Sequence, residues 1–156
     1  MSRLGALPPD PRSIFAKMMG AGMGGETDLA ALLAGMSARI QPETYVFVTL
    51  ARGVRPPAGL TPRMQFMEAE GLSLILARRE AKEAGLEYSF PCRMITLDVH
   101  SALEAVGFIA RVATALADAG MGVNPVAGFY HDHLFVPEDR AEDAMTVLEG
   151  LARSGG

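Results

Sequence analysis

One continuous stretch, residues 94–148, limits the folds open to this chain more than any other feature. Met94–Val99 alternates apolar and polar residues, which indicates a strand. A helix ending at Ala119 follows, with apolar residues at helical spacing and Gly120 to close it. Val123–Tyr130 and His133–Val136 are predicted as two strands joined by a tight turn at residues 131–132. A last amphipathic helix then favours an α+β fold with an antiparallel sheet.

The first half of the chain carries a similar order of elements. A helix capped by Thr27 is predicted to end at Gln41–Pro42, because the residue before a proline leaves the helical region. The run Leu74–Ala81 resembles Leu134–Ala141, each an apolar strand followed by a charged helix entry. Two related modules are the economical interpretation, and chance similarity of two strand–helix units is the alternative.

The prolines and glycines indicate where the N-terminal leader and the two modules begin and end. Residues 1–26 are rich in Pro, Gly and Met and are predicted as a flexible leader. The run Gly20–Gly25 lacks the preceding strand and following lysine of a phosphate loop. The modules are then residues 27–90 and 91–156. Leu86–Phe90 and Met94–Val99, interrupted at Pro91, are predicted as separate central strands that join them.

Charge and cysteine content exclude several classes of protein. The net charge of −4 disfavours a nucleic-acid partner, which rewards a basic face. Cys92 is the single cysteine, so an internal disulfide is excluded and a reducing cytoplasm fits. No apolar run reaches membrane-spanning length. We therefore expect a cytoplasmic protein with neither a nucleic-acid nor a membrane partner.

The second half resembles a known family. Val106-Gly-Phe-Ile-Ala-Arg-Val-Ala-Thr-Ala-Leu-Ala-Asp-Ala-Gly-Met-Gly-Val123 is similar to the first helix and second strand of an ACT domain. With Leu97–Ser101 before it and Gly128–His133 after it, the chain resembles the small tandem ACT proteins of bacteria. The resemblance implies two ferredoxin-like βαββαβ modules with helices on one face of antiparallel sheets. It also implies a non-catalytic regulatory module that binds a small ligand, most often an amino acid.

The resemblance departs from the family pattern at two places. A longer segment, Ser101–Gly107, stands before the helix, and each module is short by one strand or borrows one. Unpaired sheet edges recruit further strands, so we expect a homodimer or an exchange of strands. The alternative function is a structural module that joins copies or a partner enzyme without a ligand.

Ligands of ACT domains lie between modules, at the loop after the first strand and on the facing second strand. Ser101-Ala-Leu-Glu104 also matches a capping box, which would start the helix at Ala102 rather than near Gly107. Free N–H groups at this helix start suit a carboxylate, and the Asn124 side-chain oxygen suits an ammonium group. The predicted ligand-binding residues are Ser101, Leu103, Glu104, Gly107, Asn124 and Val126.

The three histidines invite a metal-site interpretation. His131, Asp132 and His133, with His100, are candidate metal ligands, because imidazole and carboxylate groups bind zinc and other transition metals. A metal-dependent enzyme is therefore a third hypothesis. Residues two apart on a strand point to opposite faces, however, so a polar turn is the preferred interpretation. Cys92 matches no nucleophile motif. We expect no catalytic residues, no metal and no cofactor.

Overall fold

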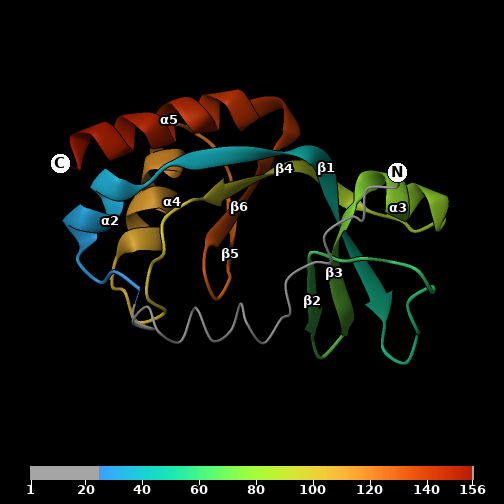
Figure 1. Ribbon diagram of the computed structural model, residues 1–156. Coiled ribbons are helices and arrows are strands. Elements are labelled where there is room, and N and C mark those ends of the chain that lie inside the picture. Colours follow the sequence, from blue (N-terminus) through green and yellow to red (C-terminus); the bar gives the residue numbers. More distant parts are fainter. Residues whose placement is uncertain (1–24, 156) are drawn as a thin grey trace, which may run out of the picture.

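The computed structural model describes residues 25–155 (Figure 1). Most of the predicted leader, residues 1–26, lies outside the described residues, as does the glycine run except for Gly25. The strands are β1 Ala38–Ala51, β2 Met64–Met67, β3 Gly71–Ala77, β4 Ser89–Leu97, β5 Asn124–Ala127 and β6 Asp132–Pro137. The helices are α2 Leu29–Gly35, α3 Arg78–Glu83, α4 Phe108–Asp118 and α5 Ala141–Ser154, with a 3₁₀ turn η1 at Glu138–Arg140.

All six strands form one antiparallel sheet in the order β2-β3-β1-β4-β6-β5. The first ferredoxin-like module uses β1, β2, β3 and α3, and β4 supplies its fourth strand. The second uses β4, α4, β5, β6 and α5, and β1 supplies its fourth strand. Each module therefore obtains its missing strand from the other half of the same chain. In the first module, the loop of residues 52–63 stands where α4 stands in the second.

The helices of the described chain cover one face of this sheet, which confirms the predicted α+β fold. Figure 1 shows α2, α4 and α5 gathered over one end and α3 at the other. Ile95 and Leu97 of β4 point toward the first group and join a core with Phe108, Val112 and Leu148. The bulges in β1 leave its even-numbered residues on this same face along the whole strand. Val46 and Val48 of β1 therefore form a second core there, together with Ala81 of α3.

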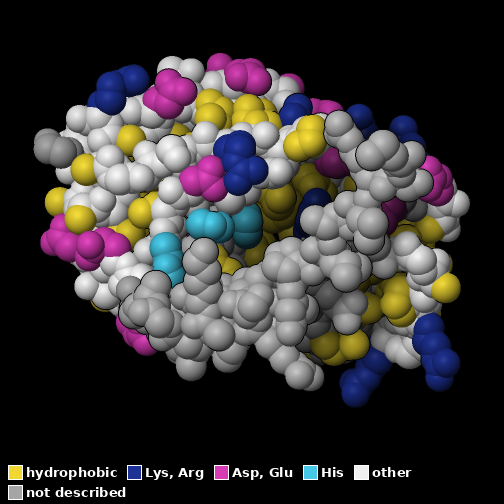
Figure 2. All heavy atoms as spheres, viewed as in Figure 1, with side chains coloured by type: hydrophobic (Ala, Val, Ile, Leu, Met, Phe, Trp, Pro, Cys, Tyr) yellow, Lys and Arg dark blue, Asp and Glu magenta, His cyan; other side chains and the backbone are white. Residues whose placement is uncertain are grey.

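The opposite face of the sheet carries a separate apolar cluster. Tyr45, Ile75, Cys92, Met94 and Phe135 are buried there. The Tyr45 and Phe135 rings meet edge to face with centroids 5.9 Å apart, a geometry that aromatic pairs prefer. Figure 2 shows this face hollowed, with the histidine side chains beside the hollow.

The structure corrects the predicted first helix. Asp28, not Thr27, is the N-cap, and its side chain accepts from the Ala31 N–H at 2.8 Å. The helix ends at Gly35, and Gln41–Pro42 lies inside β1 instead of ending the helix. Cross-strand pairing overrides the local signal, because Ile40 pairs with Ile95 and a register shift before Thr44 accommodates the proline.

The structure also differs from prediction at the central strands and at the hairpin turn of the second half. One continuous strand, β4, runs through Pro91, so the separate strand predicted at Leu86–Phe90 is wrong. Phe90 absorbs the irregularity with a positive φ of 54°. The hairpin turn lies at residues 128–131, where the Gly128 N–H donates to the His131 carbonyl at 3.0 Å. Asp132 is therefore the first residue of β6 and not part of the turn.

Candidate functional site: a pocket at the start of α4

The first turn of α4 presents backbone donors without partners. Gly107 occupies the N-cap position with a φ of 89°, and no side chain caps the helix. Within residues 25–155, the N–H groups of Phe108, Ile109 and Ala110 donate to no acceptor. Unpaired N–H groups together with the helix dipole make this end of a helix attractive to anions. The helix thus begins where the family resemblance implied, and Ser101 does not cap it.

A pocket of about 160 Å³ lies against this helix start. Its wall is built from the loop before α4, the first turn of α4 and the adjoining ends of β5 and β6. The lining residues are Ser101, Ala102, Leu103, Ala105, Gly107, Phe108, Ile109, Ala110, Ala127 and Asp132. The uncapped N–H groups therefore belong to residues that line this pocket, in which Ser101 and Asp132 are the residues with polar side chains.

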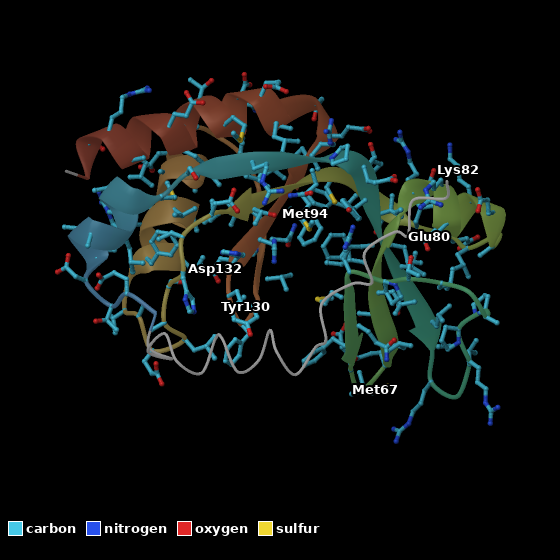
Figure 3. All side chains as sticks on the ribbon, viewed as in Figure 1. Met67, Glu80, Lys82, Met94, Tyr130 and Asp132 are labelled. Atoms are coloured by element: carbon cyan, nitrogen blue, oxygen red, sulfur yellow. The ribbon has the colours of Figure 1, made fainter. Side chains whose placement is uncertain are left out.

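Asp132 is the charged group of this pocket. The residue is 6% exposed, and the Ser101 hydroxyl donates to its Oδ2 atom at 3.0 Å. Alternation along β6 turns Asp132 to the same side as Leu134 and Val136, which face the helices. Figure 3 shows Asp132 at the end of β6, beside the loop that leads into α4. The same pocket is therefore lined by a buried aspartate and by the residues that carry the uncapped helix N–H groups.

The structure brings together some of the predicted site residues and separates others. Ser101, Leu103 and Gly107 line the pocket, whereas Glu104 is exposed and does not. Asn124 pairs with Phe135 and Val126 with His133, so both β5 side chains lie on the sheet face opposite the helices. Neighbouring Ala127 is the β5 residue that lines the pocket.

Sequence reasoning missed Asp132 because it assigned this residue to the turn. The apolar residues at 134 and 136 indicate which positions of this strand face the core. Because alternate residues of a strand share a face, residue 132 lies on the same side as they do. The turn had to be placed correctly before that alternation could be extended to Asp132.

The loop that forms the pocket wall is held by the segment before α2. The Glu26 N–H donates to the His100 carbonyl at 2.9 Å, and the Ala102 N–H donates to the Glu26 carbonyl at 3.0 Å. A Cβ on Gly25 would lie 2.5 Å from the Ala102 nitrogen, so this contact requires glycine. The position of the loop is therefore fixed by two backbone hydrogen bonds.

The histidines lie outside this pocket. His100 contacts the Tyr130 ring at 5.9 Å, and His133 Nδ1 lies 3.1 Å from the hydroxyl of buried Thr96. Burial, and then the nearby His131, lower the pKa of His133. Within residues 25–155, no three His, Cys, Asp or Glu side chains are grouped as metal ligands would be.

Cys92 lies in the interior of the protein, in the apolar cluster on the sheet face opposite the helices. Its thiol is buried and donates to the Tyr45 carbonyl at 3.3 Å. Burial, with a smaller effect of the Glu138 carboxylate, raises the pKa of Cys92 to about 12. The thiol therefore stays protonated at neutral pH, which does not suit a nucleophile.

A second pocket, of about 130 Å³, lies in the first module beside α3. Its charged groups are already engaged with neighbours. Arg79 pairs with Glu43 at 3.4 Å, and the Thr61 hydroxyl donates to Glu80 at 2.5 Å. This hydrogen bond from Thr61 is the main cause of the lowered pKa of Glu80. The pocket at the start of α4 is therefore the better candidate for a ligand.

Solved structures resemble the chain over most of its length. A Vibrio cholerae protein of unknown function, described as a possible transport protein, is 43% identical, with a TM-score of 0.72. The match covers 80% of this chain and 95% of that one. A protein from Agrobacterium tumefaciens is 18% identical over 75% of this chain and 89% of that one, with a TM-score of 0.65.

The fold also recurs in a named regulatory subunit. The ligand-free regulatory subunit of aspartate kinase from Thermus thermophilus is 11% identical, with a TM-score of 0.56. That match covers 73% of this chain and 95% of the other. A comparison with curated proteins gave no match. No helix in residues 25–155 is long and apolar enough to cross a membrane.

Family models match the two halves in turn. One ACT domain model matches residues 24–93 and another matches residues 89–150. The two matches overlap in β4, the strand that both modules share. The order of elements, the shared strands and the matched ranges all agree with the resemblance noted in the sequence. The chain belongs to the ACT domain family and carries two ACT domains in tandem.

Proposed function

We propose that this protein is a non-catalytic regulatory module that binds an amino acid in the pocket at the start of α4. One observation carries the proposal: the residues that present the uncapped N–H groups of α4 also line this pocket. A carboxylate placed there would gain charge-assisted hydrogen bonds and a favourable interaction with the helix dipole.

The size of the pocket supports a small ligand. Its volume is about 160 Å³. A cavity of roughly 150 Å³ in another protein holds benzene, which has about six non-hydrogen atoms. A small amino acid has a similar number of atoms, so the pocket suits a ligand of this size rather than a nucleotide or a peptide.

The comparisons support a regulatory role without naming the ligand. Both family matches are to ACT domains, and a structure with the same fold is a regulatory subunit of aspartate kinase. The described residues also offer no grouped metal ligands and no activated thiol on which to build catalysis. A module that changes the activity of a partner on binding a metabolite accounts for these features together.

The test is a thermal-shift screen of the twenty amino acids, followed by calorimetry with the best ligand. Ala127→Leu adds volume at the pocket wall and should abolish binding. Asn124→Ala lies on the same strand but on the opposite face and should leave binding unchanged. If Asn124→Ala weakens binding and Ala127→Leu does not, the ligand lies on the other face of β5. If no amino acid binds the wild type, the proposal fails.

A structural interaction module remains the second candidate, favoured by the sheet edges. β2 and β5 each leave one edge unpaired within the described chain. Phe66 and Met67 on β2 are 62% and 67% exposed, an apolar pair at a free edge. This candidate expects a ligand-independent homodimer, and light scattering at micromolar concentrations tests it. Loss of the dimer in Phe66→Lys, with ligand binding retained, would show that the two roles are separate.

A further inference from the structure

We propose that the hollow on the open face of the sheet is a docking site for the chain's own N-terminal segment, residues 14–19. The apolar side chains of this open-face hollow come from all six strands and include Met64 of β2, Ile75 of β3, Tyr45 of β1, Met94 of β4, Phe135 of β6 and Val126 of β5. The inference is independent of the proposed amino-acid site, which lies on the side of the sheet that the helices cover. It replaces the flexible leader expected from composition with a docked segment.

The helices of the described chain leave the open-face hollow uncovered. α2, α4 and α5 pack on the core that contains Ile95, and α3 packs on the core that contains Val46. Both cores lie on the other face of the sheet. A sheet buries a face by packing it against a second layer, and a contiguous apolar face without one marks an interaction site. The open-face hollow therefore calls for an occupant.

The polar groups beside the open-face hollow are paired with one another. Gln41 Nε2 donates to Thr96 Oγ1 at 3.1 Å, and Thr96 Oγ1 lies 3.1 Å from His133 Nδ1. Arg63 Nε donates to the Tyr45 hydroxyl at 3.1 Å. The surface between these pairs is apolar, so it gains most from an apolar occupant and least from a charged metabolite.

The described chain begins at the edge of this hollow. The Glu26 N–H donates to the His100 carbonyl at 2.9 Å, which holds residues 25–26 against the loop that follows β4. The centroids of the His100 and Tyr130 rings lie 5.9 Å apart. Figure 3 shows Tyr130 at the tip of the β5–β6 hairpin and Met94 farther along the sheet. Because β4, β5 and β6 all contribute to the open-face hollow, the segment before Gly25 is tethered beside it.

This segment is long enough to cross the hollow. β4 has nine residues, which span about 30 Å at the usual rise of a strand. The 24 residues before Gly25 span about 36 Å as a helix and more when extended. A tethered segment also docks at a high effective concentration, an advantage that a separate partner lacks.

The sequence of the segment suits an aromatic surface. Its apolar residues have the spacing i, i+1, i+4 and i+5, which is typical of one face of a helix: Ile14, Phe15, Met18 and Met19. An amphipathic helix that lies in an apolar groove uses this pattern. Methionine fills irregular gaps and makes favourable contacts between its sulfur and aromatic rings. The open-face hollow offers such rings, including Phe47 and Phe90, whose centroids lie 5.8 Å apart.

Cysteine labelling of the full chain tests the inference, because its single cysteine, Cys92, is buried. Phe15→Cys places a thiol on the apolar side of the segment. Ser13→Cys is the matched control, two residues away on the polar side. A thiol reagent should modify Phe15→Cys at least about tenfold more slowly than Ser13→Cys, since a docked side chain reacts only when its contacts open.

Substitutions in the hollow locate the contact. Val126→Asp and Met64→Asp each place a charge at a half-buried position, on opposite edge strands. Combined with Phe15→Cys, each should raise the labelling rate to that of Ser13→Cys. Val54→Asp, in the loop of residues 52–63, changes a residue that is 53% exposed and should leave the slow labelling unchanged. A cooperative urea transition shows that each variant is folded.

Three results would overturn the inference. The first is equal labelling of Phe15→Cys and Ser13→Cys. The second is slow labelling of Phe15→Cys that survives both Val126→Asp and Met64→Asp, which would place the segment elsewhere. The third is slow labelling that is lost on dilution, which would assign the open-face hollow to a second copy instead of the same chain.

Discussion

Replacing Gly107 by alanine should destabilise the protein through its backbone conformation. Gly107 has a φ of 89°, in the left-handed region that residues with a Cβ rarely adopt. The added Cβ would lie 3.6 Å from the Leu29 Cδ2 atom, an ordinary contact, so no clash contributes. The strain is about 1–2 kcal/mol. Alanine also lowers the entropy of the unfolded chain by about 0.4–1 kcal/mol, which offsets part of it.

We therefore expect Gly107→Ala to lower the free energy of unfolding by about 1 kcal/mol, measured by urea denaturation. Gly107→Asn should cost less, because asparagine tolerates the left-handed region better. Gly150→Ala is the control: Gly150 lies inside α5 and a Cβ there meets nothing within 4 Å. It should stabilise the protein by up to about 1 kcal/mol. Equal stability of Gly107→Ala and wild type would refute the backbone argument.

Two further predictions concern Cys92 and Glu138. The Cys92 thiol, buried and with a pKa raised to about 12, should react with a thiol reagent in urea but not in the native protein; rapid native labelling would contradict its burial. The pKa of Glu138 is lowered chiefly by the Thr44 hydroxyl, which donates to it at 2.6 Å. Because the folded pKa is depressed, this contribution is present above the ordinary glutamate pKa and is lost as pH falls through the folded value. Thr44→Val should therefore lower the free energy of unfolding by about 1 kcal/mol or less at pH 7, because the carboxylate is partly exposed. The loss should be smaller at low pH, and a difference that stays constant across a pH series of urea denaturations would count against this argument.

The parts of the fold that the sequence predicted correctly are those with strong local periodicity. α4 and α5 have apolar residues at helical spacing, and β3 and β6 are short apolar runs before a charged helix entry. Two of the errors fell at Pro42 and Pro91, which lie inside paired strands. A register shift between β1 and β4 accommodates Pro42, and such an irregularity depends on the partner strand, which local sequence does not specify.

The candidate site shows the same limit at finer scale. The segment that carries Ser101, Leu103 and Gly107 was located from the family resemblance, and these residues do line one pocket. Asn124 and Val126 were placed on the right strand but lie on its other face. A difference of one residue in strand alternation moves a side chain across the sheet. The alternation of β5 and β6 became definite only when the turn at residues 128–131 was known.

The sharing of β1 and β4 connects the candidate pocket to the first module without a linker. β4 runs from the edge of the first module to Leu97 and leads directly into the loop that carries Ser101. Glu138, which follows β6, accepts from Thr44 of β1 at 2.6 Å and from Arg78 of α3 at 2.9 Å. The second module is thus bonded to the first through β4 and through the turn between β6 and α5. A ligand that displaced the loop before α4 would therefore act on a strand that both modules need, which gives binding in one module a direct mechanical route to the other.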